Sequence, residues 1–266
     1  MFLPVKKEMK SSTSKLFVKK KYKAIIFDID GTLIPNRKDA MPSKKVIEAV
    51  GKAAKKINVG VATSRPYFLA KNIIEKLELT IPCVVTGGAQ IFDPISNKYL
   101  LEHMLSKDDV LKIGEIADKV NIPMIIFDDG QDYHFDKNYI PGRPFQVWIH
   151  AIETSLAEKF IKKVSRIPTI SILKVISWQK NKIDVIIANP SATKQHAISE
   201  IAKLLNIKTH QIIGVGDGYN DFPLLMACGF KIAMGNANEE LKQIADYVAP
   251  SVEEDGVAHI VEKFIL

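Results

Sequence analysis

The stretch of sequence that decides the fold reads KAIIFDIDGT and spans residues 23–32. Its apolar first half predicts a buried strand over Lys23–Phe27. Residues two apart in an extended chain face the same way, so Asp28 and Asp30 leave the end of this strand on one side. Ligands of open α/β sheets bind outside the carboxyl ends of the strands. We therefore expect the two aspartates to face a ligand.

Two neighbouring carboxylates repel each other and need a cation, a proton or both. Mg²⁺ takes oxygen ligands and keeps coordination sites for phosphate oxygens, so we expect it at Asp28 and Asp30. A carboxylate beside such a metal can attack phosphorus, and its neighbour can act as acid and base. A calcium loop is excluded because it needs glycine at its sixth position, whereas Gly31 is the fourth residue counted from Asp28.

A second acidic segment, GDGYND at residues 216–221, directly follows another apolar run. It places Asp217 and Asp221 at the carboxyl end of a second expected strand. The glycines in and before this segment do not form a dinucleotide-binding fingerprint, because Tyr219 stands where the third glycine would be. Taken alone, the segment fits equally well a glycine-rich turn in which Asn220 or Asp221 caps a helix.

Two further segments offer groups for a phosphate. Thr63 and Ser64 end an expected strand and precede a helix, where hydroxyls and free backbone N–H groups form an anion site. Lys194 lies in the first turn of another expected helix. A cation there opposes the helix dipole, a local conflict that functional sites often show. Taken singly, these segments fit a capped helix and a solvated lysine at least as well.

Alternating apolar runs and helical patterns predict one doubly wound, Rossmann-like α/β core built from both ends of the chain. Its expected strands are Lys23–Phe27, Val59–Thr63, Cys83–Thr86, Ile212–Val215 and Lys231–Ala233. Its expected helices cover 43–57, 66–77, 192–205, 221 onward and 238–245. We assign residues 21–96 and 188–266 to this core.

Between the two halves the pattern changes to closely spaced strands, some of them joined by short turns. The expected strands are Gln90–Asp93 and Lys98–Leu101, which form a hairpin, then Met124–Phe127, Tyr133–Phe135, Ile170–Trp178 and Ile183–Ala188. Expected helices cover 106–121 and 153–165. This succession predicts an antiparallel sheet, so we expect residues 97–187 to form an inserted α/β cap domain.

The net charge of +7 belongs to one end of the chain, because residues 1–23 carry eight lysines and one acid. We expect residues 1–20 to be a disordered leader, or a weak tether for an anionic surface, and no specific nucleic-acid partner. No run approaches the ~20 apolar residues of a membrane span. Cys83 and Cys228 lack CxxC spacing and a partner histidine, which favours buried thiols in a reducing compartment. We expect a cytoplasmic protein.

The ordered set of residues 28–32 (DIDGT), Thr63, Lys194 and residues 216–221 resembles the four motifs of the haloacid dehalogenase (HAD) superfamily. The large insertion between the second and third motifs resembles the Cof-type branch, subfamily IIB, with its α/β cap. Enzymes of that branch mostly hydrolyse small phosphomonoesters, commonly sugar phosphates. The resemblance therefore implies a Mg²⁺-dependent phosphatase that acts on a small phosphorylated metabolite through an aspartyl-phosphate intermediate.

The resemblance also implies a role for each motif residue. Asp28 would be nucleophile and metal ligand, and Asp30 would protonate the leaving alcohol, activate water and bind the metal through its backbone carbonyl. The remaining roles are these: Thr63 bonds the phosphoryl group, Lys194 balances charge on the phosphate and Asp28, Asp217 is a metal ligand, Asn220 contacts the phosphoryl side, and Asp221 holds Lys194 or a metal-bound water.

Two segments depart from the family pattern. Thr63-Ser64-Arg65 stands where the family often has Thr-Gly-Arg, and Gly87-Gly88-Ala89 stands where it often has Asn-Gly-Ala. The catalytic hydroxyl is kept, but we assign no substrate contact to the second loop. A polar and aromatic set in the cap could recognise a sugar or a second phosphate, or could simply complete the cap's own sheet: Tyr133, His134, Arg143, Gln146 and Trp148. Residues 141–144 read Pro-Gly-Arg-Pro, and we expect them to form a mobile loop.

Other functions stay open at this point. A phosphomutase or phosphotransferase would form the same aspartyl-phosphate and return the phosphoryl group to a sugar. A non-catalytic protein could use the fold to bind a phosphorylated ligand. The joint presence of Asp28, Asp30, Lys194 and Asp217 argues against it. A dehalogenase is disfavoured, because its chemistry needs neither Asp30 nor a metal site at Asp217.

Overall fold

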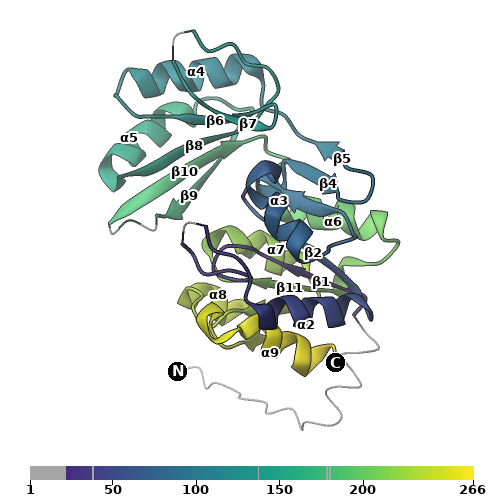
Figure 1. The fold of residues 1–266 in the computed structure, drawn as a ribbon. Helices are drawn as coiled ribbons and strands as arrows, with labels where there is room; N and C mark the ends of the chain where they lie inside the picture. The colour runs from purple at the N-terminus through teal and green to yellow at the C-terminus, as the bar shows by residue number, and fades with distance from the viewer. Residues whose placement is uncertain (1–21, 38, 137, 178, 180) are drawn as a thin grey trace.

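The computed structural model describes residues 22–266 except positions 38, 137, 178 and 180. The basic segment 1–20 therefore lies outside the described residues, as does Trp178 at the expected end of one cap strand. The remainder forms two sheet-and-helix units, one above the other in Figure 1. The lower unit contains both ends of the described chain, and the upper one is built from its middle.

The lower unit is built on five parallel strands, which we call the core sheet. In spatial order these are β13 (Tyr247–Val248), β12 (Phe230–Ala233), β11 (Ile212–Gly216), β1 (Ala24–Phe27) and β2 (Asn58–Val61). The first acidic motif thus follows a central strand, and Ala24 is in register with Ile212 on one side and Asn58 on the other. Strand β13 was not expected from the sequence.

Helices cover both faces of the core sheet. Within β1, Ile25 and Phe27 pack into one apolar cluster while Ala24 and Ile26 pack into the other, which explains why the strand is apolar throughout. Helices α2 (Lys44–Ala54), α3 (Tyr67–Lys76) and α9 (Gly256–Phe264) contribute to the first cluster; α6 (Lys194–Leu204), α7 (Phe222–Ala227) and α8 (Glu239–Ile244) contribute to the second. This arrangement confirms the doubly wound α/β class. Helix α9 was not expected from the sequence.

The expected third strand, β3 (Cys83–Val85), belongs to a small antiparallel sheet with β4 (Gln90–Asp93) and β5 (Lys98–Glu102). An isolated parallel bridge between Ala62 and Val84 joins this sheet to the end of β2. The third strand therefore continues the core sheet by one bridge only, and its main partner is the hairpin that follows it in the sequence.

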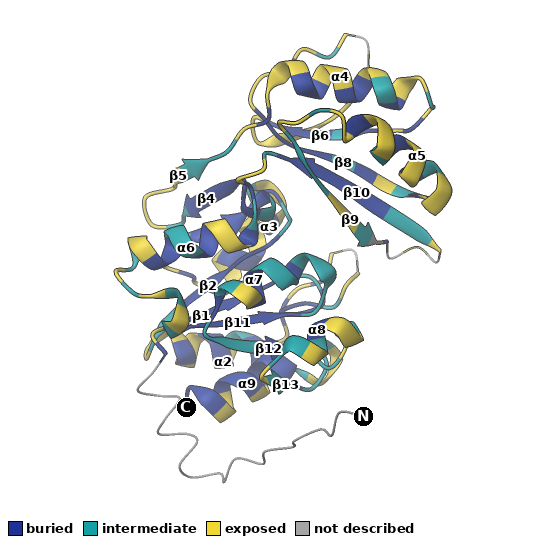
Figure 2. Cartoon of the chain, turned by 180° about the vertical axis from the view of Figure 1, so that it is seen from behind, coloured by how far each residue is buried: buried dark blue, intermediate teal, exposed yellow. Residues whose placement is uncertain are grey.

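The upper unit contains five antiparallel strands, which we call the cap sheet. In spatial order these are β7 (Gln131–His134), β6 (Ile125–Asp128), β8 (Pro144–Glu153), β10 (Lys182–Ala188) and β9 (Ser171–Ile176). Helices α4 (Lys107–Asp118) and α5 (Thr154–Val164) pack on one face through a third apolar cluster. Figure 2 shows the outer faces of these helices exposed, whereas β6, β8 and β10 are largely buried.

Strand β8, the longest strand in the described part of the chain, was missed by the sequence analysis. Its first residue is Pro144, whose ring removes a ladder donor and is tolerated at the start of a strand. The inserted antiparallel cap is confirmed, whereas its boundaries at residues 97 and 187 stay a prediction. In the described residues no helix is both long and apolar enough to cross a membrane.

Candidate active site

Asp28 lies directly after β1 and is 2 % exposed. Its backbone N–H donates to the carbonyl of Val215, at 2.9 Å, which continues the pairing of β1 with β11 past the end of the strand. The parallel register thereby brings the first and second acidic motifs together at one edge of the core sheet. The sequence analysis expected each motif at the carboxyl end of its own strand, and the pairing of β1 with β11 brings the two ends together.

Lys194 connects the two motifs. Its Nζ lies 2.6 Å from Oδ1 of Asp28 and 2.5 Å from Oδ1 of Asp221, and all three side chains are buried. The lysine is the first residue of α6, and Thr193 caps that helix by accepting from the N–H of His196. A buried cation at a helix N-terminus is unfavourable by itself, so the two carboxylates are what hold it there.

The start of α6 packs closely against the Gly87-Gly88 loop. A Cβ on Gly88, whose φ is +106°, would lie 2.4 Å from the backbone carbonyl of Thr193. The glycine therefore lets the loop contact the first turn of α6, which carries Lys194.

Asp217 lies opposite Asp28 and is held by three neighbours. Thr32 Oγ1 donates to one carboxylate oxygen at 3.2 Å, and Asn236 Nδ2 donates to the other at 3.2 Å. Gly31 adopts a φ of +77°, and a Cβ there would lie 2.1 Å from Oδ2 of Asp217. Gly31 thus provides the room in which the Asp217 carboxylate sits.

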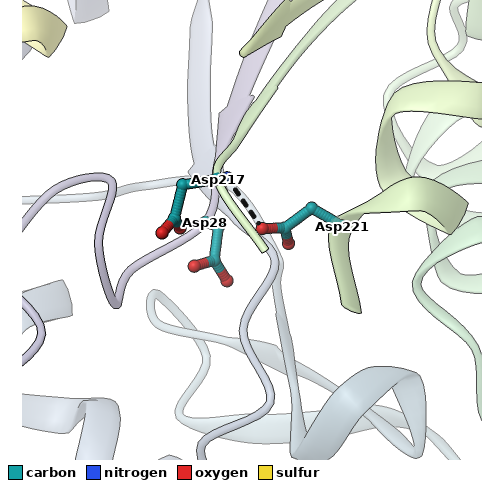
Figure 3. Close-up of side chains that lie close together, drawn as sticks. All are labelled: Asp28, Asp217 and Asp221. Atoms are coloured by element: carbon teal, nitrogen blue, oxygen red, sulfur yellow. Dashed lines mark hydrogen bonds between the residues drawn. The ribbon is translucent and has the colours of Figure 1, made fainter. Parts of the chain in front are cut away.

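Asp221 closes the cluster from the 3₁₀ turn η3 (Tyr219–Asp221). Its Oδ2 accepts from the backbone N–H groups of Asp217 and Gly218, each at 3.0 Å, while its Oδ1 accepts from Lys194. Figure 3 shows the side chains of Asp28, Asp217 and Asp221 close together, with the Asp221 carboxylate turned toward the other two. Both oxygens of Asp221 already accept hydrogen bonds. Its geometry therefore suits a residue that orients Lys194 and the backbone at Asp217 and Gly218.

The electrostatics of the cluster favour a bound cation. Burial and the charge of Asp221 raise the pKa of Asp28 well above its usual range despite the opposing effect of Lys194, and the same two causes raise the pKa of Asp217 to about 7. Burial alone would lower the pKa of Lys194, but the charges of Asp221 and Asp28 outweigh it and raise that pKa. One lysine does not compensate these carboxylates.

The donor set fits Mg²⁺. One carboxylate oxygen from each of Asp28, Asp217 and Asp221 lies within 4.8 Å of the others, and hard divalent cations prefer such oxygen ligands. The Asp30 side chain is not a member of this group. The expected contribution of Asp30 to the metal, through its backbone carbonyl, stays a prediction.

Asp30 is paired with Arg65 instead. Arg65 Nε donates to Oδ2 at 2.8 Å and Nη2 donates to Oδ1 at 2.5 Å, a two-pronged ion pair in which both side chains remain partly exposed. Burial would lower the pKa of Arg65, but its hydrogen bonds to Asp30 outweigh this and raise it. The sequence analysis quoted Arg65 within its motif without a role, and the ion pair shows what the arginine contacts.

The three other predicted phosphate-binding residues lie around the same edge of the core sheet. Thr63 is buried, and its Oγ1 accepts from the N–H of Arg65 at 3.1 Å, which leaves the hydroxyl hydrogen to donate elsewhere. Asn220 Nδ2 donates to Ser64 Oγ at 3.2 Å, so the segment 63–65 and η3 meet directly.

Asn236 is a site residue that the sequence analysis missed. Its Nδ2 donates to the carbonyl of Gly31 at 2.8 Å as well as to Asp217, and its Oδ1 accepts from Val252 N–H. The residue follows β12, so the rule that ligands bind at carboxyl ends of parallel strands could have found it.

The polar and aromatic set of the cap does not form one cluster. Tyr133 packs against Tyr139, and Arg143 pairs with Glu102 and Asp129. Gln146 and Trp148, by contrast, lie two residues apart on β8 and share a face of the cap sheet.

Comparison with known proteins places this geometry among hydrolases. A family model described as haloacid dehalogenase-like hydrolase matches residues 25–167 and 143–261. The chain is 25 % identical to the 5-amino-6-(5-phospho-D-ribitylamino)uracil phosphatase YcsE of Bacillus subtilis, over 92 % of this chain and 96 % of that one. It is also 25 % identical to Phosphoglycolate phosphatase 1 of Saccharolobus solfataricus, over 91 % and 96 %. The solved structure of the subclass IIB sugar phosphatase BT4131 superposes with a TM-score of 0.73 at 23 % identity, covering 90 % of this chain and 98 % of that one.

Proposed function

The chain belongs to the haloacid dehalogenase-like hydrolases, and we propose that it is a Mg²⁺-dependent phosphatase of small phosphomonoesters that works through an aspartyl-phosphate on Asp28. The observation that carries the proposal is the buried contact of Lys194 with both Asp28 and Asp221. It fixes one oxygen of a carboxylate at the carboxyl end of a central strand, where a ligand would bind.

In the first step, Oδ2 of Asp28 would attack phosphorus while Lys194 holds Oδ1. An Asp28–phosphorus bond forms, the bond from phosphorus to the ester oxygen breaks, and the alcohol leaves with a proton from Asp30. The Thr63 hydroxyl and the Asn220 amide would donate to the phosphoryl oxygens. Such positioning and charge stabilisation are what phosphoryl transfer needs.

In the second step, water would attack phosphorus and lose a proton to Asp30, and the Asp28 carboxylate would be released together with inorganic phosphate. In both steps the reacting oxygen would approach an Asp30 carboxyl that Arg65 holds in place. Asp28, Asp217 and the carbonyl of Asp30 would hold Mg²⁺, which would neutralise charge on the carboxylates and the phosphoryl group. Asp221 would hold Lys194 in place.

The test is release of inorganic phosphate from a panel of phosphomonoesters, with Mg²⁺ and with chelator, for the wild type and Asp28→Asn. We expect chelator-sensitive release that the substitution abolishes, while circular dichroism shows the fold retained. Appreciable Mg²⁺-dependent hydrolysis by Asp28→Asn would refute the covalent mechanism. Release only when a sugar acceptor is supplied would identify a phosphotransferase, and phosphate-ligand binding without turnover would identify a binding protein.

A further inference from the structure

The cap sheet has one face that its helices do not cover. Val147 and Ile149 of β8 belong to the apolar cluster under α4 and α5, so the residues that alternate with them, Gln146 and Trp148, point to the opposite face. In Figure 1 the helices lie beyond the cap sheet and the core lies below it. The uncovered face is therefore the one turned toward the core.

The cap and the core are in contact on two sides of the candidate active site. On one side, the ring of Phe127 on β6 contacts Phe68 on α3, with 6.2 Å between ring centroids, and α3 directly follows the Thr63–Arg65 segment. On the other side, β9 lies against η3, which carries Asn220 and Asp221. Strands β8 and β10 lie between β6 and β9, so they bridge the space between these two contacts.

Gln146 of β8 lies against the Gly87-Gly88 loop of the core. A Cβ on Gly87, whose φ is +65°, would lie 3.2 Å from Gln146 Nε2. The N–H of Gly87 in turn donates to the carbonyl of Thr63, at 3.0 Å. Gly87 thus lies between the carboxamide of Gln146 and the backbone of Thr63, the expected phosphate-binding residue.

Two polar atoms on this face lack partners. The Gln146 side chain is 2 % exposed, and its Oε1 is buried without a hydrogen-bond partner among the described residues. The same holds for Nε1 of Trp148. Buried polar groups are nearly always satisfied, and leaving one unpaired destabilises a fold. A ligand that supplies the missing partners explains both atoms together.

We propose that Gln146 and Trp148 recognise an uncharged, hydroxyl-bearing leaving group of the phosphomonoester, such as a polyol or sugar. This inference rests on the proposed function and names the substrate class of the same site. A hydroxyl group can donate to Oε1 and accept from Nε1, whereas an anion can satisfy only the indole donor. The ring of Trp148, with Phe127 at 5.7 Å, offers an apolar wall beside these groups.

A second phosphate on the substrate fits this face less well. The carboxamide and indole are neutral, and Arg143, which precedes β8, is already paired with Glu102 and Asp129. An anion buried there without a cation would carry a large desolvation cost. We therefore place Gln146 and Trp148 as specificity-determining residues for a neutral group.

The experiment compares kcat/KM for glucose 6-phosphate and ribitol 5-phosphate with kcat/KM for phenyl phosphate, which has no hydroxyl on its leaving group. We expect the wild type to prefer a hydroxylated ester, and Gln146→Leu to lower that preference by about tenfold or more, because the site loses its acceptor. Trp148→Phe, which removes the donor and keeps an aromatic ring, should lower the preference as well. Gln131→Leu on exposed β7 is the matched control and should leave both values unchanged.

Three outcomes would overturn the inference while leaving the phosphatase proposal in place. The preference could be unchanged in both variants, kcat/KM could fall equally for all esters as expected of a purely structural role, or fructose 1,6-bisphosphate could be the best substrate of the wild type. Failure of the wild type to release phosphate from every ester, phenyl phosphate included, would instead refute the proposed function and this inference with it.

Discussion

The carboxylate of Asp30 and the guanidinium of Arg65 face each other in a two-pronged ion pair, with N–O distances of 2.8 and 2.5 Å. Arg65 also donates from Nη1 to the carbonyl of Leu69 on α3, at 3.3 Å. The Arg65 guanidinium therefore connects Asp30, the proposed acid–base residue, to helix α3. A lysine cannot reproduce this geometry, because its ammonium is a single point charge.

We predict that Arg65→Lys lowers kcat by about tenfold for an alkyl phosphate, since a poorly oriented Asp30 protonates the leaving oxygen less effectively. The loss should be much smaller for 4-nitrophenyl phosphate, whose leaving group needs little protonation. Steady-state kinetics on the two esters, at saturating Mg²⁺, measure the difference. An equal loss on both would show that Arg65 acts on binding or folding rather than on proton transfer.

Gly31 gives a second prediction. Gly31→Ala should place a methyl group where the Asp217 carboxylate lies and strain a backbone with a φ of +77°. We expect a loss of activity of about a hundredfold, the order expected when catalytic groups are misplaced by about 1 Å, with a weaker rise of Tm on adding Mg²⁺. The matched control is Gly130→Ala, where φ is +81° and no atom lies within 4 Å of the added Cβ. That variant should lose stability only, so loss of activity in both would contradict the steric account.

Lys194 should contribute to stability as well as to chemistry. Lys194→Met leaves Asp28 and Asp221 buried without their cation, and breaking such a buried pair costs about 3 kcal/mol of unfolding free energy. Urea unfolding in the presence of chelator measures this loss. The double variant Lys194→Met/Asp221→Asn removes one of the stranded charges and should recover part of it. A double variant less stable than the single one would argue against charge as the cause.

Asp184 on β10 gives a pH-dependent prediction away from the site. Its Oδ1 accepts from the N–H of Ala151, at 2.7 Å, where β8 is bulged and φ is +49°, and its Oδ2 lies 3.5 Å from Nδ1 of His150. Burial would raise the pKa of Asp184, but the hydrogen bonds from His150 and Ala151 outweigh it and lower the pKa.

A carboxyl group whose pKa is lowered by folding stabilises the protein above its unfolded pKa, about 3.9, and loses that contribution as the pH falls further. Asp184→Asn should therefore cost about 1–2 kcal/mol at pH 7, and this difference from the wild type should shrink below about pH 4. Urea unfolding at several pH values checks this, with Asp132→Asn on exposed β7 as the control. A difference that grows on acidification would contradict the assignment.

The sequence was most informative at the ends of β1 and β11, where acidic residues directly follow apolar strands. The apolar runs before Asp28 and Asp217 predicted the strands β1 and β11 and placed an acidic segment after each. The parallel pairing of these strands then brings the acids to one edge of the core sheet. Ser64 and Asn220, taken from separate motifs, are in contact. The family and the α/β class with an inserted cap were predicted correctly from these residues.

The rest depended on contacts that no local pattern encodes. Strand β8 begins with Pro144, which local rules read as a loop. Arg65 was quoted without a partner because its ion pair with Asp30 joins residues 35 positions apart. Asn236 follows a short strand and has no motif around it. The unpaired atoms of Gln146 and Trp148 become visible only once the face of the cap sheet is known.

The central position of β1 has a consequence for how the protein is made. One of its neighbours, β2, follows within a few tens of residues, but β11 begins at Ile212. At ribosomal rates of about 5–20 residues per second, roughly 10–40 s pass before that second partner emerges. During this interval one edge of the apolar strand β1 lacks its partner strand, and the Asp28 carboxylate lacks Lys194. Chains released early would expose that edge to other chains, so we expect protection of the nascent first half by chaperones to matter more for yield than the stability of the finished fold.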